Sequence, residues 1–560
     1  TRDFSPTEIA NRNYIFNTIK AAFETYGFQP IETPSFENSS TLMGKYGEEG
    51  DRLIFKILNS GDYFEKLTKN LLNFDNILSK YKKLINEIVS DISNIYDKES
   101  DFNDNHQIFT FKNSIYKPLS NISNFFDSNF SIELFFDLQD SVVYKMMTDD
   151  IEESKEFILD LATDVYLWNS NIDFKLKNWL ANKFVNNTSS NNITSIISEK
   201  ALRYDLTVPF ARYVVQHQNE ITFPFKRYQV QPVWRADRPQ KGRFREFFQC
   251  DADVVGSKSL WQEVEFIQLY DTVFSKLGLL GTTIKINNRK ILSGIAEVIG
   301  AQDKLIDFTV ALDKLDKIGQ EKVEAEMLSK GITEDAIQKV QPLFSFDGNN
   351  QENLDALVSM LATSEEGTKG VEELRFVINS IAELGLQSAN LEVDVTLARG
   401  LNYYTGAIFE VAAPKGVKMG SIGGGGRYDD LTGIFGLKDV SGVGISFGLD
   451  RIYLVLEELG LFKTVELPKP KVVFLNFDAS TDVAKMKAIK VLRENNIKSE
   501  FYPDLGESNK KQKRQWKYVT NREIEFVVSK VENDVFILKE MNSSEQFNCS
   551  LSELVDKLKA

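Results

Sequence analysis

A predicted β-hairpin constrains the fold of this chain more than any other stretch. Residues 233–249 contain Val233 and Trp234, a charged loop with Pro239 and Gly242, and a second aromatic segment that ends at Gln249. Two strand-like segments joined by a loop with proline and glycine predict antiparallel neighbours in a sheet. The chain must therefore build a sheet around this hairpin.

Arginines make the loop of this hairpin a candidate phosphate site. Arg235 and Arg243 lie on opposite arms, and arginine stays protonated while offering forked donors that match phosphate oxygens. The two side chains are therefore candidates to bind two phosphates of one ligand. Gln249 and Asp253 follow in an apolar setting and need polar partners if they are buried. The alternative to a phosphate site is that these arginines lie on an exposed hairpin and bind no ligand.

A second unusual stretch, residues 397–406, combines Arg399 with the adjacent Tyr403 and Tyr404 before an apolar segment at 407–413. Neighbouring residues of a strand face opposite sides, so such a segment would present a cation and phenolic hydroxyls at the edge of a sheet. Considered alone, a tyrosine-rich strand that closes a hydrophobic core is the simpler interpretation.

Glycines and a further arginine follow this stretch. Residues 423–426 are four consecutive glycines, which allow the backbone to approach a ligand closely, but no Gly-Lys-Ser/Thr ending follows, so the run is not a P-loop. Residues 443–451 predict a strand that turns into a helix. Arg451 lies at the start of that helix, where it could face a nucleotide.

Periodicity and composition divide the chain into alternating parts. An amphipathic helix begins at Ser5-Pro6, and a segment with two prolines at 29–36 suits an edge or interface strand, so the two could form a dimer contact. We expect a core in three parts (1–64, 193–286 and 389–465), helical insertions at 65–192 and 287–388, and a C-terminal α/β domain at 470–560. In that last domain we expect strand, helix, strand, helix, two further strands and a final helix, with parallel pairing.

Composition limits the classes of function. The 560 residues are 42% hydrophobic and 26% charged, as in a globular protein, and the net charge of -15 argues against indiscriminate binding to nucleic acid. Local basic clusters at 227–245 and 510–517 remain, although a solvated helix face explains the lysines equally well. Two cysteines and two histidines make a dedicated zinc site unlikely to form. Without a signal segment or a long apolar run, we expect a soluble cytoplasmic protein.

These motifs together resemble the class II aminoacyl-tRNA synthetases and, more narrowly, the histidyl-tRNA synthetases, over nearly all of the chain except 65–192. The three ordered motifs of that family match the opening helix with its proline-bearing strand, the hairpin at 235–249, and the turn at 444–451. Its histidine signatures match 203–207 and 397–406. The resemblance implies an α/β fold with an α+β catalytic core, built as an antiparallel sheet flanked by helices, and a C-terminal anticodon-binding domain.

The resemblance also implies roles for individual residues. Asp205, Thr207 and Gln249 would hold the α-amino end of histidine, Asp253 and Tyr404 would read the imidazole, and Tyr403 would line the pocket. ATP would be bound by Arg235 at the α-phosphate, Arg243 at the γ-phosphate, and Phe247 with Arg451 on the two faces of adenine. Arg399 would contact both the histidine carboxylate and the α-phosphate, which makes Arg235 and Arg399 the candidate catalytic residues.

The implied reaction joins histidine to the 3′ end of tRNA(His) through a histidyl-adenylate, with release of pyrophosphate. ATP would arrive with Mg²⁺, and no metal held by the protein, no membrane contact and a homodimer are expected. A non-catalytic histidine- or tRNA-sensing paralogue is the rival, but such proteins commonly lose the arginines that are present here. A synthetase for another amino acid is disfavoured by the paired tyrosines with Asp253. The role of 65–192, the tRNA identity contacts, the order of substrate binding and the effect of Asn402, where much of the family has Asp, remain open.

Overall fold

The computed structural model describes residues 2–61, 198–346, 348–398, 403–462, 465 and 467–559, together with the single positions 79, 83 and 90. The insertion predicted at 65–192 therefore lies outside the described residues, apart from those three positions. Arg399 and Asn402 also lie outside them.

A largely antiparallel sheet forms the centre of the described chain. It has eight strands in the order β1-β5-β6-β11-β10-β9-β7-β8. The strands are β1 (Gln29–Pro30), β5 (Phe225–Trp234), β6 (Glu246–Val255), β7 (Thr283–Asn288), β8 (Asn390–Val393), β9 (Ala407–Ala412), β10 (Gly423–Tyr428) and β11 (Gly442–Gly448). Only the two edge pairs, β1 with β5 and β7 with β8, are parallel among these described strands. The predicted hairpin is β5 and β6, and the predicted antiparallel sheet is confirmed.

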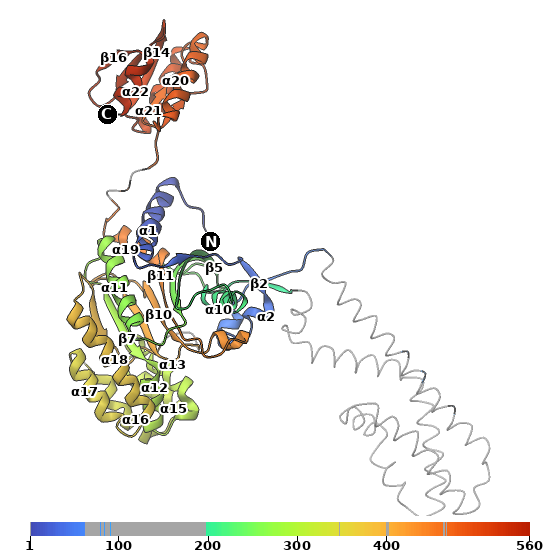
Figure 1. Cartoon of the computed structure of the whole chain (residues 1–560), viewed down its shortest axis with the longest axis vertical. Helices are drawn as coiled ribbons and strands as arrows, with labels where there is room; N and C mark the ends of the chain where they lie inside the picture. The colour runs from blue at the N-terminus through green and yellow to red at the C-terminus, as the bar shows by residue number, and fades with distance from the viewer. Residues whose placement is uncertain are drawn as a thin grey trace, which may run out of the picture.

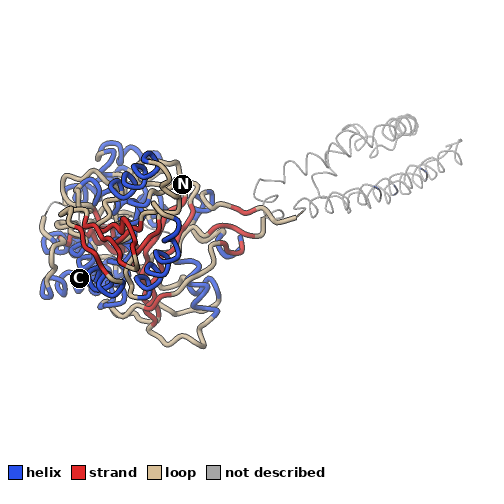
Figure 2. The backbone as a smooth tube through the Cα atoms, turned by 90° about the horizontal axis from the view of Figure 1, so that it is seen from above, coloured by secondary structure: helices blue, strands red, loops and turns tan. Residues whose placement is uncertain are grey.

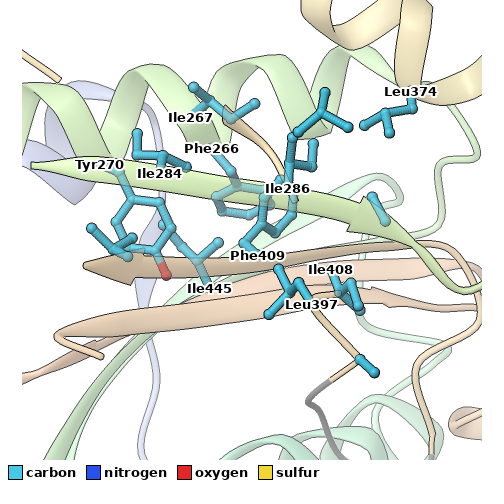
Figure 3. Packing of buried hydrophobic residues seen from close by; sticks show 14 of the residues in the cluster. Phe266, Ile267, Tyr270, Ile284, Ile286, Leu374, Leu397, Ile408, Phe409 and Ile445 are labelled. Carbon is cyan, nitrogen blue, oxygen red and sulfur yellow. The ribbon is translucent and has the colours of Figure 1, made fainter. Parts of the chain in front are cut away.

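Three helices cover one face of this sheet. They are α1 (Pro6–Thr25), α11 (Trp261–Lys276) and α19 (Leu449–Glu458). The first begins as predicted, since Ser5 and Glu8 form a capping box and Pro6 occupies the first turn. Figure 3 shows Phe266, Ile267 and Tyr270 of α11 packed over strand residues such as Ile286 and Ile445. The amphipathic pattern of α1 holds for Ile15 and Ile19, which are buried, whereas Ile9 in the first turns of the helix is 43% exposed.

Strand alternation makes the opposite face of the sheet polar. In β6, Cys250, Ala252 and Val254 belong to the hydrophobic core under the helices. Gln249, Asp251 and Asp253 alternate with them and therefore point to the other face. This second face is where a polar site can be built.

Helix α10 (Thr207–Gln216) packs against the polar face, and a small sheet lies next to α10 in the sequence. The small sheet has the order β2-β4-β3 and consists of β2 (Phe36–Asn38), β3 (Lys56–Ile57) and β4 (Lys200–Leu202), with short helices α2 (Ser39–Leu42) and α3 (Gly47–Arg52) between them in sequence. Side chains of α10 form a second core with Tyr428 of β10. Phe210 of α10 also lies under the guanidinium of Arg227 on β5, at 4.1 Å from the ring centroid. Helix α10 therefore covers part of the polar face, through the second core and the contact between Phe210 and Arg227.

The segment between β7 and β8 is helical, as the periodicity predicts. It contains α12 (Arg289–Val298), η1 (Gln302–Lys304), α13 (Leu305–Leu312), α14 (Leu315–Ile318), α15 (Gln320–Ser329), α16 (Glu334–Val340), η2 (Gln341–Ser345), α17 (Asn350–Met360) and α18 (Glu365–Leu384). Figure 1 shows these helices grouped together in yellow and green below the central sheet. Their buried side chains continue the core of the sheet through residues such as Leu374.

The C-terminal part forms a second sheet with its own hydrophobic core. Its order is β13-β12-β14-β15-β16. Its elements are β12 (Val472–Phe474), η4 (Ala479–Thr481), α20 (Asp482–Glu494), β13 (Ser499–Phe501), α21 (Asn509–Asn521), β14 (Phe526–Glu532), β15 (Val535–Glu540), β16 (Gln546–Cys549) and α22 (Leu551–Lys559). The expected two strands after the second helix are three, and parallel pairing holds only for β12 with its two neighbours, because tight turns join β14, β15 and β16 as antiparallel strands.

Figure 2 shows many of the strands in the middle of the described chain with helices around them, and further short strands toward its side. The mixed α/β class expected from the sequence is therefore confirmed. Within the described residues, every helix is too short or too polar to cross a lipid bilayer.

Candidate active site

Two adjoining cavities open among the residues of the polar face. The larger has a volume of about 420 Å³ and the smaller about 40 Å³. Both are lined by Gln249 of β6, Ser446 of β11, Gly424 and Gly425 of β10, and Tyr404, so they meet at these residues. A ligand with two parts, one in each cavity, would have its junction here.

The smaller cavity gathers the residues expected to bind histidine. Six of the seven candidates line it, from three separate parts of the chain: Asp205, Thr207, Gln249, Asp253, Tyr403 and Tyr404. The seventh, Arg399, lies outside the described residues. The geometry brings the candidates together, while their individual roles stay predictions.

Asp205 is held by three hydrogen bonds from the protein. The Tyr46 hydroxyl and the backbone N–H of Val208 donate to Oδ1, at 3.0 Å and 3.1 Å. The Tyr403 hydroxyl donates to Oδ2 at 3.1 Å. Burial nevertheless raises the pKa of Asp205, and these donors oppose the rise because they favour the charged form. The result is a fixed, buried carboxyl at the start of α10.

Asp253 is fixed by partners on two neighbouring strands. Arg227 Nη2 of β5 lies 2.7 Å from Oδ2, and the Tyr428 hydroxyl of β10 donates to Oδ1 at 2.6 Å. Burial raises the pKa of this carboxyl as well, opposed chiefly by Arg227. Gly444 is required beside it, since a Cβ there would lie 1.9 Å from Asp253 Oδ1.

Tyr403 and Tyr404 precede β9 in a turn and an irregular segment, so the interpretation that places these two tyrosines in a strand is wrong. Their rings meet edge to face, with centroids 5.1 Å apart. Burial raises the pKa of both phenols, which therefore stay neutral and can donate hydrogen bonds at physiological pH. Just after them, the backbone N–H of Thr405 donates to the carbonyl of Arg427 on β10 at 2.8 Å, which ties the segment to the sheet.

The glycine run is a strand rather than a ligand-binding loop. It forms most of β10, in the middle of the sheet, with β9 and β11 on either side. A Cβ on Gly426 would lie 2.7 Å from the carbonyl oxygen of Ala407 and 2.8 Å from a ring carbon of Tyr404. Gly424 and Gly425 still line both cavities. The glycines therefore make room for neighbouring strands and for the tyrosine as well as for a ligand.

The larger cavity gathers all four residues expected to bind ATP: Arg235, Arg243, Phe247 and Arg451. Arg235 follows β5, and its Nε donates to the carbonyl of Tyr204 at 3.0 Å. Its guanidinium carbon lies 4.2 Å from the centroid of the Tyr204 ring and 5.2 Å from that of Phe247. Cation-π contacts and a backbone acceptor thus orient this arginine.

Arg451 and Arg243 occupy different environments in the same cavity. Arg451 of α19 donates to the carbonyl of Gly242 at 3.2 Å and to that of Ser421 at 2.6 Å, which fixes it between the hairpin loop and the segment before β10. Arg243 is 37% exposed at its side chain, and its Nη1 lies 3.8 Å from Asp237 Oδ1. A long, half-exposed ion pair contributes little and leaves the guanidinium available for a phosphate.

Several residues around the cavities were not singled out in the sequence. Tyr46, Arg227 and Tyr428 hold the carboxyls described above; no motif marks the two tyrosines, and Arg227 was noted only as part of the basic cluster at 227–245. Asp251 lines the smaller cavity, and burial raises its pKa to about 7, opposed by Arg227. Its signal was present, because Gln249, Asp251 and Asp253 are spaced by two residues along one strand.

The described residues contain no group of three or more His, Cys, Asp and Glu side chains with the geometry of a metal site. The polar groups that the cavities offer are guanidinium, carboxyl, phenol, amide and aliphatic hydroxyl groups. Such a set can bind a zwitterionic amino acid beside a polyphosphate, and it offers no side chain arranged as an activated nucleophile.

Comparisons with known proteins identify the family of the chain. A family model described as histidyl-tRNA synthetase matches residues 198–452. A histidine–tRNA ligase of Christiangramia forsetii is 54% identical over 100% of this chain and 98% of its own length, and one of Flavobacterium johnsoniae is 55% identical over 99% and 97%. The crystal structure of a histidyl-tRNA synthetase from Nostoc shares the fold, with a TM-score of 0.63, 24% identity, and coverage of 100% of this chain and 97% of that one. With such identity along its whole length, the chain belongs to the histidine–tRNA ligase family.

Proposed function

We propose that the protein activates histidine with ATP and transfers it to the 3′ end of tRNA(His). In the first step a carboxylate oxygen of histidine bonds to the α-phosphorus of ATP, and the bond from that phosphorus to pyrophosphate breaks. In the second step a terminal ribose hydroxyl of the tRNA takes the histidyl group, and AMP leaves. The observation that carries this proposal is the junction of the two cavities at Gln249 and Tyr404.

The smaller cavity suits a selective reader of histidine. Asp253 and Tyr404 would hydrogen-bond the imidazole nitrogens, Asp205, Thr207 and Gln249 would hold the α-amino end, and Tyr403 would line the pocket. A side chain without matching polar atoms would leave these buried groups unpaired. Sites of this kind discriminate by roughly 10⁴ to 10⁵ without a separate editing step.

The larger cavity suits ATP with its magnesium ion as one substrate. Arg235 would contact the α-phosphate, Arg243 the γ-phosphate, and Phe247 with Arg451 would enclose the adenine. Magnesium binds mainly through phosphate oxygens and water in such complexes, so a dedicated set of protein ligands is not needed. Arg399 would bridge the histidine carboxylate and the α-phosphate, and with Arg235 it would stabilise the charge that develops on phosphate oxygens.

The C-terminal sheet and its helices, within residues 470–560, would bind the anticodon stem. Helix α21 supports this, because Lys510, Lys511, Lys513, Arg514 and Lys517 are exposed while Gln515 and Val519 are buried. An exposed basic face is what a phosphate backbone requires, although the protein as a whole is acidic. We also propose the division of the rest of the chain that the sequence predicts, into a catalytic core in three parts and two insertions.

We also propose a homodimer in the cytoplasm. The edge strand β1 carries Pro30 and pairs on one side only, with β5, among the described strands. Close to it in sequence, Phe36 is 53% exposed. Phe36 belongs to β2, which is an edge strand of the small sheet, and an exposed apolar side chain on an edge strand supports a protein partner there. Cys250 and Cys549 are free thiols, as expected of a reducing compartment.

A non-catalytic sensor of histidine is the second candidate. The presence of four arginines that such sensors commonly lose argues against it: Arg235, Arg243, Arg399 and Arg451. ATP–pyrophosphate exchange measured with each of the twenty amino acids separates the two. Exchange stimulated by histidine alone is the expected result. Exchange with none of them would favour the sensor, and exchange with a different amino acid would overturn the assignment of substrate.

A further inference from the structure

A carboxyl that the family resemblance leaves without a role faces the smaller cavity. Three carboxyl side chains line that cavity, Asp205, Asp251 and Asp253, and its described lining residues include no lysine or arginine. Asp205 has three protein donors, and Asp253 has Tyr428 and Arg227. The cavity is therefore suited to a ligand that brings a positive charge.

Asp251 is the least satisfied of the three. Its residue is 2% exposed, and among the described residues no donor reaches its Oδ1. Ser446, which lies directly opposite on β11, is its hydrogen-bonding neighbour within the site. A buried carboxyl oxygen without a donor costs free energy, so the observation points to a donor that arrives with a ligand.

Gln249 has a matching unsatisfied oxygen. Its Nε2 donates to Ser446 Oγ at 3.3 Å, while its buried Oε1 has no donor among the described residues. Gln249 and Asp251 are two residues apart on β6, so they share a face with their backbones about 7 Å apart. Gln249 lines both cavities and Asp251 only the smaller, which places Asp251 one step further from the ATP side.

We propose that Asp251 is a binding residue for the α-ammonium group of histidine and that it acts together with Gln249. This inference rests on the proposed function. The ammonium group carries a full positive charge and three N–H donors at neutral pH, whereas the imidazole is largely neutral. The anionic oxygen without a protein donor is the better complement of the charged end, and Asp253 with Tyr404 remains for the imidazole.

The rigid surroundings of Asp251 keep this acceptor in position. Strand β6 lies between β5 and β11, with Asp251 paired to Gln229 on one side and Ser446 on the other. Arg227 lies close enough to Asp251 to favour its charged form, but the ion pair of Arg227 is with Asp253, and its Nε and Nη1 have no hydrogen-bond partner among the described residues. No hydrogen bond joins Arg227 to Asp251 among the described residues, so Oδ1 of Asp251 stays available for a donor from the cavity.

Two histidine analogues separate contact with the ammonium group from a general structural role. Histidinol keeps the ammonium and the imidazole, whereas 3-(imidazol-4-yl)propionate lacks the ammonium. In histidine-dependent ATP–pyrophosphate exchange, Asp251→Asn should raise the KM for histidine and the inhibition constant of histidinol by about tenfold or more. The inhibition constant of imidazolylpropionate should change by less than about twofold, because its missing group is the one that Asp251 contacts.

An equal change for both analogues, or no change for either, would overturn the proposal. Such an outcome would assign Asp251 to the strand network instead, for example as a donor to the unpartnered Oε1 of Gln229. Asp271→Asn is the matched control, because Asp271 is also 2% exposed but accepts from the backbone N–H groups of Ser388 and Ala389 outside the cavities. It should leave both inhibition constants unchanged.

A second variant keeps the test decisive if Asp251→Asn does not fold. Ser446→Ala removes the hydroxyl that positions both Gln249 and Asp251, and it should weaken histidinol selectively in the same way. Weakening of both analogues by Ser446→Ala would count against the proposal. Failure of the underlying function is distinguishable, since the unmodified protein would then show no exchange with histidine.

Discussion

The Tyr403 hydroxyl donates a hydrogen bond to Asp205 Oδ2 at 3.1 Å and so joins residues 198 positions apart in sequence. The contact fastens the segment before β9 to the start of α10. It also helps to keep a buried carboxyl ionised, because a donor to the charged form opposes the rise in pKa that burial causes. This one hydrogen bond therefore holds two walls of the smaller cavity together and also favours the charged form of the Asp205 carboxyl in it.

Tyr403→Phe should therefore raise the KM for histidine by about fivefold to tenfold, with a smaller effect on kcat. The Asp205 carboxyl would lose one of its donors and bind a cation less well. Steady-state ATP–pyrophosphate exchange measures both constants. Tyr26→Phe removes a comparable hydroxyl, 2.8 Å from Thr272 Oγ1 and outside both cavities, and should leave the KM unchanged. Equal KM values for Tyr403→Phe and the unmodified protein would contradict the prediction.

Arg243→Ala should raise the KM for ATP by about tenfold or more, since a charge-assisted hydrogen bond to phosphate contributes about 1.5–3 kcal/mol. The affinity for histidine in the absence of ATP should stay the same, because Arg243 lines only the larger cavity. Calorimetric titration with histidine and exchange kinetics with ATP give the two values. Arg375→Ala removes an arginine that pairs with Asp355 on α17, and it is the control. Loss of histidine affinity in Arg243→Ala would show that the two cavities are not separate in this way.

Asp251→Asn should stabilise the ligand-free protein at pH 8 while it weakens histidine binding. Burial raises the pKa of Asp251 from 3.8 to about 7, opposed by Arg227 and supported by Asp253 and Asp205. The folded state therefore binds the proton of the Asp251 carboxyl more tightly than the unfolded state does. The free energy of unfolding consequently falls as the pH rises from about 4 to about 7. The variant escapes that loss, so its melting temperature should exceed that of the unmodified protein at pH 8 and approach it near pH 4.

The same melting experiment with saturating histidine compares how strongly the ligand stabilises the two proteins. Histidine should raise the melting temperature of the unmodified protein more than that of Asp251→Asn, because at the same concentration a ligand that binds the folded state more tightly stabilises it more. A lower melting temperature for ligand-free Asp251→Asn at pH 8 would mean that Asp251 is paired and ionised in the folded protein.

Arg399→Ala should nearly abolish histidine-dependent exchange and leave the fold intact. The expectation comes from the family resemblance, in which this arginine joins the carboxylate of histidine to the α-phosphate of ATP. Circular dichroism and exchange rates report on the two properties. An active and normally folded Arg399→Ala protein would remove Arg399 from the catalytic residues.

Charge reversal on α21 should separate tRNA charging from adenylate formation. Lys513→Glu with Lys517→Glu should raise the KM for tRNA by about tenfold or more at low salt, because each basic contact to a phosphate contributes to binding. ATP–pyrophosphate exchange should stay normal. Lys487→Glu with Lys490→Glu makes the same change of charge at exposed positions of α20 and is the matched control. Similar effects of the two double variants on charging would show only a general loss of attraction.

Local patterns in the sequence were sufficient for most elements of the fold. The capping signal at Ser5 and Glu8, the loop with Pro239 and Gly242, and the strand-to-helix turn at Arg451 act over a few residues, so they could be recognised without the rest of the chain. The structure of the glycine run and of the two tyrosines was harder to predict from the sequence. Residues 423–426 have no side chains that reveal a strand, and their need for glycine comes from Gly444, Tyr404 and Ala407 on other segments.

The sequence by itself determined the family motifs, most of the helices and strands, and the candidate residues of both ligands. Only the tertiary structure decided which polar groups are satisfied. Asp205 receives its donors from Tyr46 and Tyr403, and Asp253 from Tyr428 with Arg227, whereas Asp251 keeps an oxygen without a donor among the described residues. The physical reason is that hydrogen bonds across a sheet depend on strand order and register, which bring together residues that no sequence spacing relates.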